Sequence, residues 1–175
     1  MTRKWTALAT LVLMLSPALA AAQAMSVGKE HLRRDEYGLA VKTFTSYIEQ
    51  YPHKSLPYEL RACAYLRMDS LGLALKDIAK TQQVDTSEQT GSFANWLAGI
   101  AWLFQGNATT ADSLFSKATV GSPSVAGQRI AQARQNTDSL FVGDSVNEQS
   151  SEQYRQRLGG LLLDEFIDYQ LFGTK

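Results

Sequence analysis

The residue types that most often carry catalysis are sparse in this chain. The chain has a single cysteine, Cys63, and two histidines, His31 and His53, and one thiol–imidazole pair to consider is Cys63 with His31. A thiol and an imidazole form such a pair only when they lie within hydrogen-bond reach of one another. Nothing in the sequence places Cys63 beside His31, and His53 follows Pro52 at the expected end of a helix. We therefore expect no enzyme, and a thiol enzyme that uses Cys63 is the least favoured alternative.

Cys63 has two interpretations that do not involve catalysis. A single cysteine cannot form an internal disulfide, so stability must come from packing. Free cysteine behaves as a small hydrophobic residue, and we expect Cys63 to be buried in a helix. The alternative is a free thiol that is open to intermolecular pairing.

No metal or cofactor site is expected. No set of His, Cys, Asp and Glu has metal-ligand spacing, and the sequence has no glycine-rich phosphate loop and no nucleophile elbow. Asp164, Glu165 and Asp168 form an acidic cluster, but no calcium-binding loop accompanies it, so we interpret it as a solvated helix face. Basic and acidic residues number 17 each, which gives no electrostatic case for a nucleic-acid partner.

Residues 1–24 are predicted to be a secretory signal peptide and not part of the fold. Arg3 and Lys4 precede an apolar run of 11 residues, Trp5–Leu15, whereas a transmembrane helix needs about 20. Small residues follow, so cleavage is expected after one of three alanines: Ala20, Ala22 or Ala24. The alternative is a membrane anchor that stays attached. Cleavage would leave no stable membrane span and an exported protein, either periplasmic or secreted.

A pattern of small and large apolar residues recurs three times after this segment. Each copy has an alanine followed four positions later by a large apolar residue: Ala40 and Phe44, Ala74 and Ile78, Ala111 and Phe115. The alanines are 34 and then 37 residues apart. Residues four apart lie on one helical face, where the alanine lets a neighbouring helix approach and the larger residue fills the space beside it.

A second pattern precedes each copy. A Gly or Ala lies three residues before a ring: Gly28 and His31, Ala62 and Tyr65, Gly99 and Trp102. Turn-forming residues then follow, with Asp35, Asp69 and Gly106 at their centres. The sequence therefore predicts three helix–turn–helix units.

These units resemble the tetratricopeptide repeat, a 34-residue helix–turn–helix with L-G-x2-Y, A-x3-F and P at fixed spacing. The resemblance covers about residues 22–125, and it departs at His31 and Thr81, where the family has an aromatic residue and an alanine. It implies an all-α fold, a short α-solenoid of about three repeats that needs a capping helix at its C-terminal end. The expected divisions are a repeat domain over 25–137, a loop over 138–150 and an amphipathic C-terminal helix over 151–172.

The C-terminal helix has two possible roles. Its apolar residues recur at helical spacing, and Gly159-Gly160 in its middle predicts a kink or break. We expect it to cap the last repeat. The alternatives are a helix that binds a partner or pairs with a second copy of the chain.

The resemblance also implies a concave groove, lined by the first helix of each repeat, that accepts an extended peptide or a helix. Its predicted lining is Lys29, Arg33, Glu59, Cys63, Arg67, Phe93, Trp96, Ile100 and Phe104. Aromatic residues and Arg carry much of the binding energy at protein interfaces. The alternative for the aromatic members is core packing, against neighbouring helices or against the C-terminal helix folded back into the groove.

We expect an exported adaptor or scaffold that binds a protein or peptide partner, for which a component of an envelope assembly machine is one candidate. The alternative is a structural protein that self-associates into a homo-oligomer through its C-terminal helix.

Overall fold

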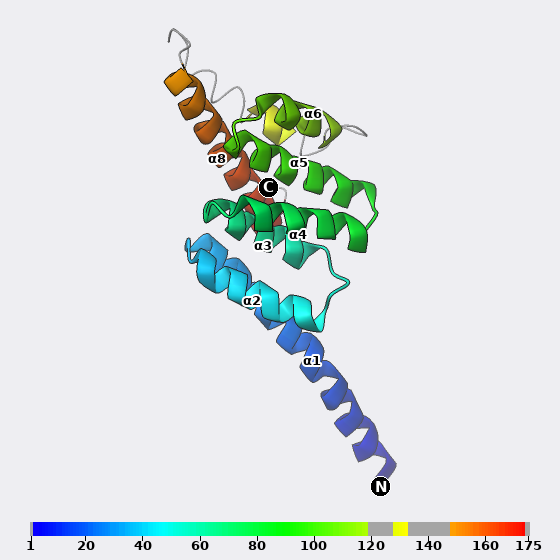
Figure 1. Ribbon diagram of the computed structural model, residues 1–175. Coiled ribbons are helices and arrows are strands. Elements are labelled where there is room, and N and C mark those ends of the chain that lie inside the picture. Colours follow the sequence, from blue (N-terminus) through cyan, green and yellow to red (C-terminus); the bar gives the residue numbers. More distant parts are fainter. Residues whose placement is uncertain (1, 119–127, 133–147, 174–175) are drawn as a thin grey trace.

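The computed structural model is a stack of paired helices (Figure 1). It describes residues 2–118, 128–132 and 148–173, and no strand occurs in these ranges. Three pairs follow one another along the chain: α1 (Thr2–Arg33) with α2 (Tyr37–Gln50), α3 (Leu56–Arg67) with α4 (Leu71–Val84), and α5 (Glu88–Phe104) with α6 (Ala108–Ala118). A long final helix, α8, covers Glu148–Phe172. The predicted all-α solenoid of about three repeats with a C-terminal helix is confirmed.

The turns inside the three pairs share one backbone geometry. The central residue of each turn has a left-handed conformation: Asp35 (φ 59°), Asp69 (φ 54°) and Gly106 (φ 80°). The next N–H then donates to the carbonyl five residues earlier: Glu36 to His31 at 2.9 Å, Ser70 to Tyr65 at 2.8 Å and Asn107 to Trp102 at 2.9 Å. This closure satisfies carbonyl groups that the end of a helix leaves free. The internal repeat of the sequence is therefore also a repeat of backbone structure.

The two helices of a pair approach closely where a small residue meets a large one. A Cβ atom added to Gly28 would lie 2.5 Å from the ring of Phe44, and one added to Gly99 would lie 2.4 Å from the ring of Phe115. Both rings are almost completely buried. The second repeat carries a slightly larger residue and a smaller partner at the corresponding positions, both of them buried: Ala62 and Ile78. The small residue and the large one thus compensate each other from repeat to repeat.

A buried ion pair joins the two helices of the second repeat, and its arginine also contacts the first repeat. The guanidinium of Arg61 on α3 bonds both carboxylate oxygens of Asp77 on α4, each at 2.7 Å. Its Nη1 also donates to Thr45 on α2 at 2.9 Å. Because both charged groups are mostly buried, removal of either one would leave the other without its partner, which is far more costly than the loss of an exposed pair.

The helix α8 packs on the inner layer of the stack. The first helices α1, α3 and α5 contact one another in succession, and α8 lies along α5 and α3. Figure 1 shows it, orange to red, running from beside α5 toward α3. It contributes five side chains to the larger of the two core clusters: Leu158, Leu162, Leu163, Phe166 and Ile167.

Two expectations about the C-terminal region need correction. The predicted break at Gly159-Gly160 is wrong, because α8 is one uninterrupted helix. A Cβ atom on Gly159 would lie 2.5 Å from the ring of Phe104, so this glycine permits a close approach and does not break the helix. The helix also begins at Glu148 and not at residue 151. Residues 133–147, which include most of the predicted loop, lie outside the described residues.

We predict opposite effects for two alanine substitutions in the same helix. Gly99→Ala should lower the free energy of unfolding by about 1–3 kcal/mol, because Phe115 is buried and cannot move away. Gly91→Ala, which has open space around it, should raise that free energy by up to about 1 kcal/mol through helix propensity. Chemical denaturation measures both, and equal effects would contradict the close contact between α5 and α6.

Candidate partner-binding surface

The nine predicted groove residues lie on the three first helices, and the structure brings most of them against α8. Six of them contact that helix directly: Lys29, Glu59, Arg67, Phe93, Trp96 and Phe104. Cys63 and Ile100 are completely buried in the core cluster to which α8 belongs. Arg33 is the exception. The inner face of the stack is therefore a continuous surface that holds a helix of the same chain.

Aromatic rings form the floor of this surface. Phe166 of α8 stands edge-on to Trp96 and to Phe93 of α5, with ring centroids 5.3 Å and 5.6 Å apart. Tyr169, one turn further along, meets Phe93 with centroids 5.2 Å apart. Edge-to-face contacts of this kind add to the gain from burying the rings. Of the two interpretations of these aromatic residues, the structure therefore shows packing against the C-terminal helix.

Polar contacts border the aromatic floor along the length of α8. Near the middle, Arg67 pairs with Asp164 and Arg129 pairs with Glu165. Near the end, the side-chain amide of Gln170 donates to Glu59 at 2.9 Å, and Lys29 of α1 donates to the backbone carbonyl of Gln170 at 2.8 Å. These contacts set the position of α8 relative to α1 and α3, since apolar contacts alone have little directional preference.

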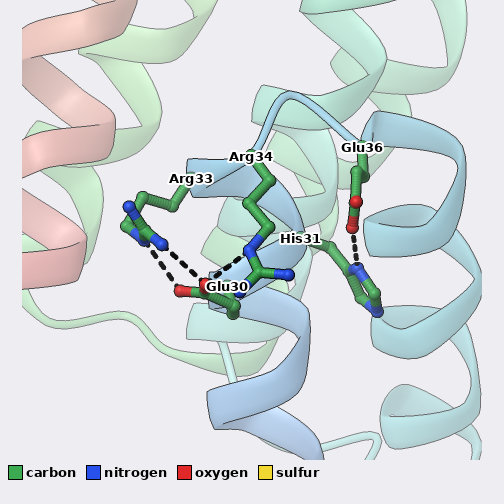
Figure 2. Close-up of polar contacts among 5 residues, drawn as sticks. All are labelled: Glu30, His31, Arg33, Arg34 and Glu36. Atoms are coloured by element: carbon green, nitrogen blue, oxygen red, sulfur yellow. Dashed lines mark hydrogen bonds and ion pairs between the residues drawn. The ribbon is translucent and has the colours of Figure 1, made fainter.

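Arg33 lies at the end of this surface and is half-exposed. Figure 2 shows Glu30 between the guanidinium groups of Arg33 and Arg34, at 2.6 Å and 2.7 Å. These bonds, that of Arg33 first, lower the pKa of Glu30 to about 2. His31 points the other way and places Nδ1 2.6 Å from a carboxylate oxygen of Glu36. Its imidazole is therefore engaged with Glu36, the residue that precedes α2.

Cys63 is buried in the middle of the surface. Glu59 and Arg67, which both contact α8, lie four residues before and after it on the same face of α3. Burial raises the pKa of the Cys63 thiol well above its usual value, with a further contribution from the negative charge of Glu59. A thiol with this environment stays protonated and is a poor nucleophile. The prediction that Cys63 is a buried residue is confirmed.

Glu59 is an acidic side chain buried at an otherwise apolar surface, with only 3% of its area exposed. Burial raises its pKa to about 7, and the negative charge of Asp85 adds to the rise. An isolated buried carboxylate is costly when ionised, and the single bond from Gln170 offsets that cost only in part. The carboxyl group therefore changes charge near neutral pH beneath the C-terminal end of α8.

Sequence reasoning missed three features of the surface. The ion pair of Arg129 with Glu165 is the first, because nothing in the repeat pattern relates the helical segment 128–132 to α8. Gln170 gave no signal, because an isolated glutamine on a helix is usually solvated. The role of Gly159 had a signal, since a glycine inside an amphipathic helix marks either a break or a close approach.

No group of three or more metal-binding side chains occurs among the residues that the structure describes. Within the same residues, no helix has the length and apolar character needed to cross a membrane. Comparisons with protein-family models, with curated proteins and with solved structures find no match. Partner contact by the nine residues stays a prediction, since α8 lies on the surface that they form.

We predict that Glu59 makes stability depend on pH. Because its pKa is higher in the folded chain than the unfolded value of 4.5, its stabilising contribution is full below pH 4.5 and is lost as the pH rises to about 7. Glu59→Gln keeps the size and an acceptor for Gln170. It should stabilise the protein at pH 8, by at most roughly 3 kcal/mol, and much less at pH 5.

Denaturation at both pH values measures this difference. The same substitution at exposed Glu49 is the matched control for the loss of one negative charge. An equal effect of Glu59→Gln at pH 5 and pH 8 would show that the folded chain does not perturb this carboxyl group.

Proposed function

We propose that this chain is an exported adaptor of the tetratricopeptide type, which binds a helix of a partner protein on its concave inner face. One observation carries the proposal: this face already accommodates an amphipathic helix, α8, in contact with all three first helices. A surface that fits one helix in shape and charge is suited to another of similar character. Recognition by helix-in-groove docking is a common use of such surfaces.

The residue types on the face also support binding. Its centre is aromatic and apolar, with Phe93, Trp96 and Ile100, while Arg67 and Lys29 lie at its border. Aromatic and Arg side chains contribute strongly at interfaces when they are buried at the centre. Polar groups at the border favour one register and one direction of the bound helix.

Export is proposed from the N-terminal sequence alone. Helix α1 runs without interruption through the proposed cleavage region, and only its later part pairs with α2. In Figure 1 the earlier part projects away from the stack. Loss of residues 1–24 would leave Gly28 and Leu32, which pack on α2, in place. A periplasmic or secreted location, and an envelope assembly component as partner, follow by analogy with exported repeat proteins.

Self-association through α8 is the second candidate. The apolar side of α8 is buried within its own chain, so a dimer of this type requires α8 to leave its place. Mass in solution distinguishes the two candidates, since the adaptor is expected to be a monomer without its partner.

We predict that a photo-crosslinking residue at Arg33 captures the partner in the native host, because Arg33 is one of the nine predicted groove residues and is half-exposed. The same residue at Leu73, which is exposed on α4, is the control. A protein captured equally from both positions, or from Leu73 alone, would contradict binding on the inner face.

We also predict cleavage of the exported chain after Ala20, Ala22 or Ala24. N-terminal sequencing of the protein from the envelope or culture fluid should find a chain that begins between residues 21 and 25. Recovery of an intact N-terminus from the membrane fraction would favour the retained anchor.

A further inference from the structure

The contact between α8 and the stack leaves hydrogen-bond donors unsatisfied. Among the described residues, three buried side-chain nitrogen atoms have no hydrogen-bond partner: Nε of Arg67, Nε1 of Trp96 and Nε of Arg155. All three belong to this contact. Arg67 and Trp96 touch α8, and Arg155 belongs to α8 and lies beside Gly106 at the end of α5. The unsatisfied donors are therefore concentrated at the contact between α8 and the stack.

Each such donor gives up its bonds to water when α8 is in place and receives none in return. Trp96 illustrates the cost, because its indole is completely buried and its Nε1–H has no hydrogen-bond partner among the described residues. The ion pairs of α8 compensate little. Asp164 is more than half exposed, and Glu165 is about one-third exposed, so water screens both pairs. Apolar contacts therefore hold α8 against an opposing polar cost.

The stack itself does not have this weakness. The helices α3 and α4 are joined by the buried and fully bonded pair of Arg61 and Asp77. A close contact between Gly and Phe joins the two helices of the first pair, and another joins the two helices of the third pair. The pairs therefore have packing and polar contacts of their own that do not involve α8.

The contact between α8 and the stack also indicates which features another helix would need in order to bind the inner face. Phe104 needs a residue without a side chain opposite it, the place occupied by Gly159. The aromatic floor needs a ring where Phe166 lies. Arg67 and Arg129 each face a carboxylate of α8, so the surface is complementary to an acidic helix.

We propose that α8 is a displaceable occupant of the inner face, and that the partner which replaces it is an acidic amphipathic helix with a small residue opposite Phe104 and an aromatic residue against Trp96. This inference rests on the proposed function, since it names the partner and the step that precedes its binding. Displacement returns Arg155 to water and lets the new helix offer acceptors to Trp96 and Arg67.

Cys63 provides a direct measure of displacement. It is the single cysteine of the chain, it is completely buried, and it lies between two α8-contacting residues of α3. A maleimide reagent can reach it only when α8 has moved or the stack has unfolded. Circular dichroism separates these two cases, because an unfolded stack loses its helix signal.

The experiment compares three full-length exported chains: wild type, Gly159→Leu and Gly160→Ala. Leu at residue 159 cannot fit against Phe104, whereas a Cβ atom at residue 160 meets nothing within 4 Å. We expect Gly159→Leu to raise the rate of Cys63 labelling at least about ten-fold with helix content retained. In wild type the tether keeps α8 at about millimolar effective concentration over Cys63, and the substitution prevents α8 from binding there. Gly160→Ala should label as slowly as wild type.

The probe is a synthetic peptide with the sequence of residues 148–172. It should protect Cys63 of the Gly159→Leu chain at micromolar concentration. A peptide with Asp164→Asn and Glu165→Gln should need about three- to ten-fold more, since it loses both exposed ion pairs. A peptide with Phe166→Ala should not protect. Wild-type protein should stay a monomer and bind the first peptide at least ten times more weakly than the Gly159→Leu chain.

The contrary outcomes are distinct. Equal peptide affinity for wild type and Gly159→Leu, or slow labelling of both chains, would overturn displacement of α8. Photo-crosslinking from Arg33 tests the proposed function separately. If the Gly159→Leu chain is labelled quickly and the peptide does not slow its labelling, the inner face does not bind a helix from a separate molecule. That result would overturn the proposed function as well. Equal affinity of the acidic and neutral peptides would overturn the acidic partner. A wild-type dimer would make a second copy of this chain the occupant.

Discussion

The close approach of a residue without a bulky side chain to a large buried one is the constraint on which the structure depends. Phe44 and Phe115 reach their positions only because Gly28 and Gly99 leave room for them. Helix pairs with this contact come close enough to bury their apolar faces on one another. Each pair still has a second apolar side, which requires a neighbouring pair or another helix to cover it.

The helix α8 uses the same device in a different part of the molecule. Gly159 receives Phe104 as Gly99 receives Phe115, although α8 belongs to none of the repeats. It thereby comes close enough to bury Trp96 and Phe93 of α5. A short stack of three pairs has a large inner face for its size, and the chain covers this face with its own last helix.

The contact of α8 with the inner face combines extensive apolar packing with polar groups that lack hydrogen-bond partners. The ionisable Glu59 and the unpaired N–H of Trp96 lie at the same surface, whereas the contacts within the stack are well satisfied. A contact built only for stability would have apolar groups or complete hydrogen bonds at such positions. An uneven contact of this kind fits a surface that has to release one helix and accept another.

Local sequence patterns predicted the helices, the turns and the division into three repeats, because these depend on interactions between residues near one another in the chain. Ala40 with Phe44, and Asp69 between two helices, are local signals of this sort. The packing of α8 was needed to show that Gly159 admits a ring and does not break α8, and that Trp96 lies in the core. Those outcomes depend on the contact of α8 with α5 and α3. The contacting residues are far apart in the chain, 55 residues for Phe104 and Gly159 and 97 for Arg67 and Asp164, and no local pattern specifies such a contact.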